Sequence, residues 1–152
     1  MDFGQAAELV EALRSKDETK AYQCFKLLEK ESSDTDHVYP FFDLFADLIE
    51  DENSYVRTRG LLLIAANARW DTENKIDELI DSYLKHIEDV KPITSRQCIK
   101  ALPSIVKYKP GLYDCICTAL EQANPGIYRD SMSSLVMRDI AEALASIRRE
   151  GR

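Results

Sequence analysis

The sequence predicts an all-α fold, an α-α superhelix of about four helical hairpins. Apolar residues recur at helical spacing over nearly the whole of its 152 residues, and short polar breaks separate about eight such runs. Gly and Pro, which interrupt helices, number only five each. The second helices of successive pairs align on Cys24, Gly60, Cys98 and Ile140, with offsets of 36, 38 and 42 residues. A period of about 40 residues is typical of stacked helical hairpins.

The expected helices in the first half of the chain are marked by start signals and breaks. The polar segment 15–17 ends a first amphipathic helix, and Asp17 is a good N-cap for the second. In that second helix Leu27 is expected to face the core. Pro40 suits a first helical turn, and Ser54 suits a cap. The four expected helices span 4–14, 18–31, 40–50 and 54–68.

The second half of the chain continues in the same way. Asp71 or Thr72 is expected to cap a long helix, and Thr94 or Ser95 is expected to open the next. Pro103 falls inside that next helix, where it removes a backbone hydrogen bond and is expected to produce a kink. A chain of this length is expected to form a single domain over 1–152. The four expected helices span 73–88, 94–108, 110–123 and 130–148.

One hairpin carries a specific resemblance. Asp51 lies in the turn before the expected helix 54–68, and Arg57 follows six residues later, with small or apolar residues after it. The pattern resembles a HEAT unit, and the chain resembles HEAT-like (ARM-type) helical-repeat proteins, including small bacterial ones sometimes labelled SufBD-type. The resemblance implies a solenoid in which the Asp of each turn and the Arg after it form a stacking ladder. Asp89 keeps the acid in the next turn, whereas Ser95 stands where the Arg would be.

Several classes of chemistry lack the residues they need. The four cysteines include no CxxC pair, and Cys115 and Cys117 lie about 200° apart around their helix, so they do not grip one metal. Cys24 and Cys98 take equivalent core positions and are expected to pack there. The two histidines have no partners at metal-ligand spacing and are expected to be solvated. Walker A, GxGxxG and GxSxG motifs are absent from the sequence. We therefore expect no cofactor, no metal and no enzymatic activity.

Composition bounds the location and the partners. The formal net charge is −7, which disfavours nucleic acid and anionic membranes if it is spread evenly. The N-terminal stretch does not resemble a signal peptide, and the longest apolar runs are too short to span a bilayer. A cytoplasmic protein with reduced thiols, which makes no membrane contact, is the expectation.

Charge is distributed unevenly over the expected helices. The segments 54–69 and 92–109 contain no acidic residue, whereas 38–51 contains no basic one. In a HEAT-like stack the second helices line the concave side, so a basic strip is predicted there. These cations could instead pair with acids of neighbouring helices, or only face solvent. The predicted partner-binding residues are Arg59, Arg69, Trp70, Arg96, Lys100, Lys107 and Arg138, with Arg149 extending the strip.

The function that these observations favour is a non-catalytic adaptor or scaffold, which binds a protein partner along the basic concave face. An acidic segment of that partner would suit such a face. The alternative is nucleic-acid binding related to HEAT-like DNA glycosylases, which use aromatic residues and an Asp on their concave face. Trp70 and Asp71 could be compared with those residues, but no extended motif matches, and the favoured interpretation is that Trp70 packs at a hairpin corner and Asp71 caps a helix.

Overall fold

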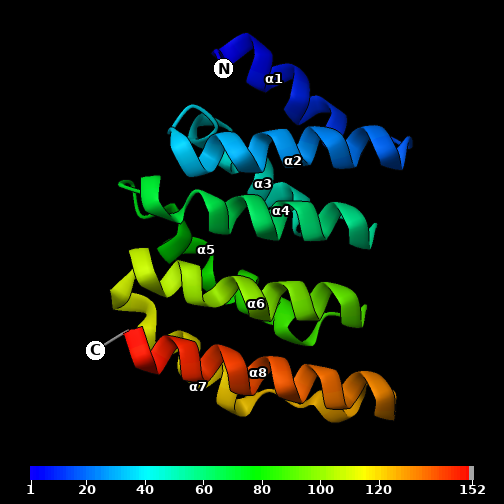
Figure 1. Ribbon diagram of the computed structural model, residues 1–152, viewed down its shortest axis with the longest axis vertical. Helices are drawn as coiled ribbons and strands as arrows, with labels where there is room; N and C mark the ends of the chain where they lie inside the picture. The colour runs from blue at the N-terminus through cyan, green and yellow to red at the C-terminus, as the bar shows by residue number, and fades with distance from the viewer. Residues whose placement is uncertain (151–152) are drawn as a thin grey trace. The chain divides into compact units, whose positions relative to one another are not determined.

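A computed structural model of the chain describes residues 1–150 (Figure 1). Over this range the chain forms eight α-helices joined by short 3-10 turns, which confirms the all-α prediction. The contacts divide the chain into unit 1, Met1–Glu73, and unit 2, which begins at Asn74. The single domain expected over 1–152 stays a prediction, and each unit is described by itself.

Unit 1 is built around α4, which packs against α2 and α3. Helix α2 packs in turn against α1 and η1. Fully buried side chains from all these elements, such as Leu13, Leu28, Phe45 and Leu61, form the core of the unit. Its elements are α1 (Phe3–Glu11), η1 (Ala12–Arg14), α2 (Glu18–Asp34), η2 (Tyr39–Phe41), α3 (Phe42–Leu48), α4 (Ser54–Ala66) and η3 (Ala68–Trp70).

Unit 2 is built around α6 and α8, which pack closely along their lengths (Figure 1). The shorter α7 packs against both of them, and η4 packs against α6. Ile76, Tyr83, Ile99, Leu102 and Ile116 are fully buried in the core. The elements of the unit are α5 (Lys75–Leu84), η4 (Lys85–Glu88), α6 (Pro92–Tyr108), η5 (Pro110–Leu112), α7 (Tyr113–Gln122), η6 (Pro125–Ile127) and α8 (Asp130–Glu150).

The helices α4, α5 and α6 do not begin at the caps that the sequence suggested. Asn53, rather than Ser54, caps α4 by accepting from the amides of residues 55 and 56. Asp71 does not cap α5; its carboxylate accepts the Tyr39 hydroxyl at 2.7 Å. Helix α6 begins at Pro92, two residues before the expected start, because Pro is well suited to the first turn.

The burial of α2 corrects another expectation. Leu27 was predicted to face the core, but 52% of its surface is exposed. The helix packs through the stripe formed by Ala21, Phe25, Leu28 and Ser32, which are spaced at three and four residues. Leu27 falls outside that stripe, and Cys24, expected to pack in the core, lies at its edge and is half-buried. Cys98 is buried as expected.

The turn that carries the HEAT resemblance is held by Arg57. Its guanidinium donates to the carbonyl oxygens of Asp51 and Glu52, both at 3.0 Å. The carboxylate of Asp51 accepts from the Asn53 amide at 2.8 Å and from Arg14 at 3.3 Å. Arg57 therefore organises the backbone of the turn between α3 and α4, and Asp51 ties that turn to η1.

No helix within residues 1–150 is long and apolar enough to cross a membrane.

Helices α3 and α4 approach closely at Gly60, and replacing this residue tests their packing. A Cβ at Gly60 would lie 2.8 Å from the Cβ of Leu48 and 2.9 Å from the carbonyl oxygen of Phe45. Gly60→Ala should therefore lower the free energy of unfolding in urea by about 1–2 kcal/mol, since overpacking outweighs the better helix propensity of Ala. Gly111→Ala is the control, because a Cβ added at Gly111 would meet no other part of the protein within 4 Å. Equal stability of the two variants would contradict the close approach.

Candidate functional site

Arg59 serves the interior of unit 1 and is a poor candidate for partner binding. Its side chain is only 6% exposed, and its guanidinium pairs with the carboxylate of Glu18. It also donates to the carbonyl oxygen of Leu13 at 3.0 Å. These contacts join α4 to η1 and to the first turn of α2. The charge of Arg59 is therefore paired inside unit 1.

Arg69 and Trp70 satisfy the carboxyl end of α2. The last carbonyl groups of a helix have no partner within the helix itself. The Trp70 indole N–H donates to the carbonyl oxygen of Ser32 at 2.7 Å, and Arg69 donates to that of Ser33 at 2.7 Å. The Arg69 guanidinium also lies 4.9 Å from the centre of the Trp70 ring. The pair therefore has a structural role, although Arg69 keeps an exposed side chain.

Arg96 forms a largely buried ion pair with Asp139 in unit 2. Its Nε lies 2.6 Å from one carboxylate oxygen of Asp139, and its Nη2 lies 3.5 Å from the other. The side chain of Asp139 is 1% exposed and that of Arg96 is 18% exposed. The hydrogen bond to Asp139 raises the pKa of Arg96. The pair joins α6 to α8, and neutralising Arg96 would therefore disturb the fold as well as any surface.

The remaining predicted cations lie exposed on α6 and α8. Lys100 and Lys107 are seven residues apart and share one face of α6. Lys100 forms no ion pair with any residue within 1–150, and the ammonium of Lys107 lies 5.3 Å from the centre of the Tyr108 ring. Arg138 makes only a loose, exposed contact with Glu142 at 3.8 Å. Arg149 is also exposed, near the end of α8.

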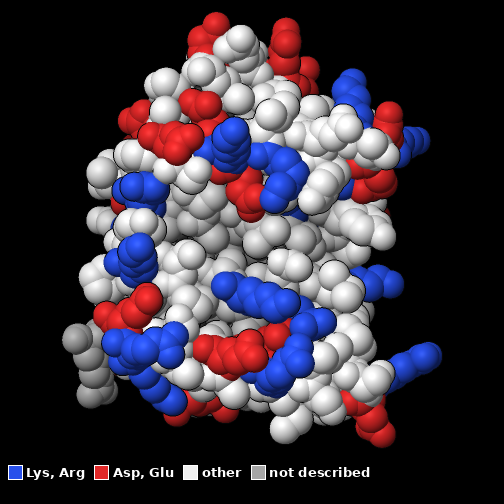
Figure 2. Space-filling view, in the orientation of Figure 1, with Lys and Arg blue, Asp and Glu red and all other residues white. Residues whose placement is uncertain are grey.

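Figure 2 shows basic and acidic side chains interleaved over the part of the surface that α6 and α8 present. Within unit 2 the structure places Lys100 and Arg138 near the carboxylate of Glu142, whereas Lys107 lies about two turns further along α6 and Arg96 serves the interior. Their role in partner binding stays a prediction.

Sequence reasoning missed the acid that holds Arg96. Asp139 takes a place in the apolar stripe of α8, between Val136, Ile140 and Ala143, all of which are buried. A carboxylate at such a position needs a partner, because burying an unpaired charge is costly. That exception to the apolar pattern was the signal that could have found the pair.

Three polar side chains, those of His86, Asp89 and Tyr128, meet at the turn between η4 and α6. The Nδ1 of His86 lies 2.7 Å from a carboxylate oxygen of Asp89, and the Tyr128 hydroxyl donates to the Asp89 carbonyl oxygen at 2.6 Å. The expectation that His86 is solvated is wrong, because its side chain is 12% exposed. No group of three or more metal-ligating side chains occurs within residues 1–150. The contacts of His86 and Asp89 hold the turn together.

Comparisons with protein families, with curated proteins and with solved structures find no match to this chain.

Replacing Arg96 tests its structural role. Arg96→Met should lower the free energy of unfolding in urea by about 3 kcal/mol, because it leaves the Asp139 carboxylate buried without a partner. Lys100→Met, one turn further along α6, is the matched control and should change stability by less than about 0.5 kcal/mol.

The double variant Arg96→Met/Asp139→Leu should recover most of the lost stability, because two apolar side chains replace the buried pair. If Arg96→Met were as stable as Lys100→Met, Arg96 would be an ordinary surface cation.

The exposed thiol of Cys115 gives a pH-dependent prediction. Partial burial, and then the negative charge of Asp81, raise its pKa. Less of the reactive thiolate is therefore present at neutral pH, so iodoacetamide should modify Cys115 more slowly than an unstructured cysteine peptide, with the rate rising as pH increases. Asp81→Asn should accelerate the reaction, and Asp114→Asn is the control. Mass spectrometry of the Cys115 peptide measures the rates; slower alkylation in Asp81→Asn would contradict the assignment.

Proposed function

We propose that the chain is a non-catalytic scaffold of HEAT-like helical hairpins, which binds an acidic protein segment along the α6–α8 face of unit 2. The observation that carries the proposal is the charge of α6. No acidic residue occurs within Pro92–Tyr108, while Lys100 and Lys107 project from its exposed face. Two cations that form no ion pair with residues 1–150 and share one helical face are available to carboxylates of a partner.

The neighbouring helix extends the same face. Arg138 is exposed on α8 and only loosely paired, so it can exchange Glu142 for a carboxylate of the partner. Exposed ion pairs contribute little energy individually, and such a face would act mainly through complementary charge and orientation. A partner held in this way dissociates more readily as salt rises.

A protein segment fits this face better than nucleic acid does. Nucleic-acid sites neutralise many phosphates, and their affinity falls steeply with salt. Here the exposed cations are few, the carboxylate of Glu142 lies among them, and the whole chain has a formal net charge of −7. A short acidic segment needs only a few cations and tolerates one carboxylate beside them.

The test is a capture experiment from a lysate treated with nuclease, with the bound proteins identified by mass spectrometry. Lys100→Glu/Lys107→Glu should lose at least about tenfold of a partner captured by the wild-type protein, because like charges then oppose its carboxylates. Lys16→Glu/Lys20→Glu, two exposed lysines of unit 1, is the control with the same change in charge.

A synthetic peptide of the acidic segment should then compete for binding. Equal capture by both variants would contradict the proposal. If a partner were captured from untreated lysate but not from lysate treated with nuclease, a nucleic-acid ligand would be favoured instead.

A further inference from the structure

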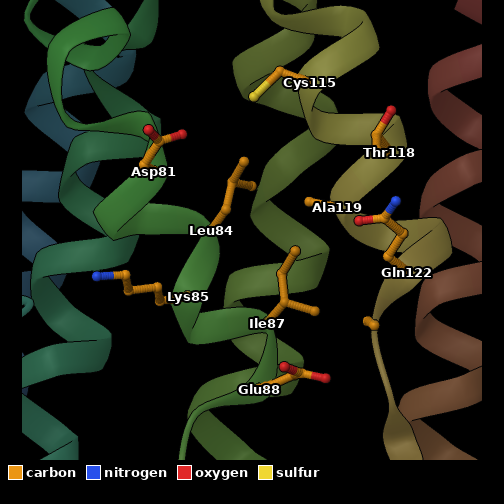
Figure 3. Close-up of a pocket in the computed structure, with 10 residues that line it drawn as sticks. Asp81, Leu84, Lys85, Ile87, Glu88, Cys115, Thr118, Ala119 and Gln122 are labelled. Carbon is orange, nitrogen blue, oxygen red and sulfur yellow. The ribbon is translucent and has the colours of Figure 1, made fainter.

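The groove between the first helices of unit 2 is a separate feature from the basic face. It has a volume of about 420 Å³ and lies between α5 with η4 on one side and α7 on the other (Figure 3). That volume falls within the range of small binding sites. Apolar side chains, carboxylates and a thiol line it, among them Asp81, Leu84, Ile87, Glu88, Cys115, Thr118 and Ala119.

The groove has an apolar middle. Figure 3 shows Leu84 and Ile87 directed into the space that separates η4 from α7, with Ala119 on the opposite wall. Ile87 is buried, and Leu84 is half-exposed along the groove. The middle can therefore bury the aliphatic part of a ligand.

Carboxylates lie toward the two ends of the groove. Asp81 is exposed and makes no ion pair with any residue within 1–150. Glu88 is seven residues further along, and one of its oxygens accepts the backbone N–H of Asn124 at 2.7 Å, which leaves the other oxygen available. Lys85 is directed away from α7 in Figure 3, so it does not neutralise the space between the carboxylates.

The surrounding elements are also acidic. Helix α7 contains Asp114 and Glu121 and no basic residue. The elements α5, η4 and α7 contain six carboxylates and two lysines, and two of those carboxylates, Asp77 and Glu121, pair with Lys109 and Arg148. The thiol of Cys115, with its raised pKa, adds no negative charge of its own at neutral pH.

We infer that this groove docks a basic, amphipathic segment of a partner protein. Lysine or arginine side chains of the segment would meet Asp81 and Glu88, and apolar side chains between them would cover Leu84, Ile87 and Ala119. Charge complementarity selects this occupant, because an acidic segment would be repelled by the carboxylates at both ends. The site differs from the α6–α8 face in its helices and in the charge of the segment that it accepts.

The probe is a fluorescein-labelled helical peptide with two lysines seven residues apart and leucine and alanine between them. Two lysines at this spacing lie on one face of a helix, about 10 Å apart along its axis. The comparison peptide carries glutamate in place of both lysines. Fluorescence anisotropy at about 0.15 M salt measures binding, since nonspecific attraction between distant charges is largely screened there.

The lysine peptide should bind the full chain more tightly than the glutamate peptide. Asp81→Asn should weaken its binding about three- to fivefold, which is the effect of one partly exposed ion pair. Asp114→Asn, an identical change on α7 outside the lining of the groove, should leave binding unchanged.

Thr118→Arg places a long cation at the exposed rim of the groove and should reduce binding more than tenfold without disturbing the core. Bound peptide should also slow alkylation of Cys115, which lines the groove. Equal binding of the two peptides, equal effects of Asp81→Asn and Asp114→Asn, or unchanged binding in Thr118→Arg would each overturn the inference.

Two further measurements distinguish binding in the groove from binding at the α6–α8 face and from self-association. Lys100→Glu/Lys107→Glu should leave binding of the lysine peptide unchanged. The proposal for the groove can therefore be contradicted without contradicting the proposal for the α6–α8 face, and the reverse. Sedimentation of the chain alone tests a second copy as the occupant. Self-association that Thr118→Arg abolishes would overturn the assignment to a basic partner segment.

Discussion

The buried ion pair between Arg96 and Asp139 is the constraint on which unit 2 depends. A carboxylate in the apolar stripe of α8 is tolerated only where a cation reaches it. The pair therefore fixes the position of α8 against α6. Such a pair adds little net stability compared with apolar packing, but a shift of α8 along α6 would leave both charges without a partner. Uniqueness of the packing is the benefit that we attribute to it.

In unit 1, hydrogen bonds of polar side chains hold helices together in addition to the ion pair of Arg59 with Glu18. The Asn67 amide donates to the Ser32 hydroxyl at 3.1 Å, and that hydroxyl donates to the Leu28 carbonyl oxygen at 2.7 Å. The Trp70 indole reaches the adjacent carbonyl of α2. Buried polar groups are costly unless they are paired, so these contacts determine how α4 and η3 meet the end of α2. In both units, polar side chains that resemble surface features in the sequence hold helices together.

This dual use of polar residues accounts for what could be predicted from the sequence. The periodicity of apolar residues predicted the all-α fold and the approximate position of every helix, because burial of one helical face is a local pattern. It left open whether the cations bind a partner or pair within the fold, and it could not identify the oxygens that Arg59, Arg69 and Arg96 bind, because these lie more than 30 residues away. The exposure of Leu27 was missed for a related reason, since adjacent leucines both satisfy a broad apolar face.

The groove between η4 and α7 could not be found from composition either, because it is created by how closely two helices approach. What the sequence does contain is the sign of its charges. In unit 2, Arg148 pairs with Glu121, and Lys109 pairs with Asp77. These charges form ion pairs within the folded chain, as Arg96 does with Asp139. The exposed charges left on α6 are lysines, and the charge of Asp81 at the groove is negative. If these side chains only faced solvent, positive charge on α6 and negative charge at the groove would not need to be kept apart. Folding does not require the separation either, and it supports the proposal that the α6–α8 face and the groove dock segments of opposite charge.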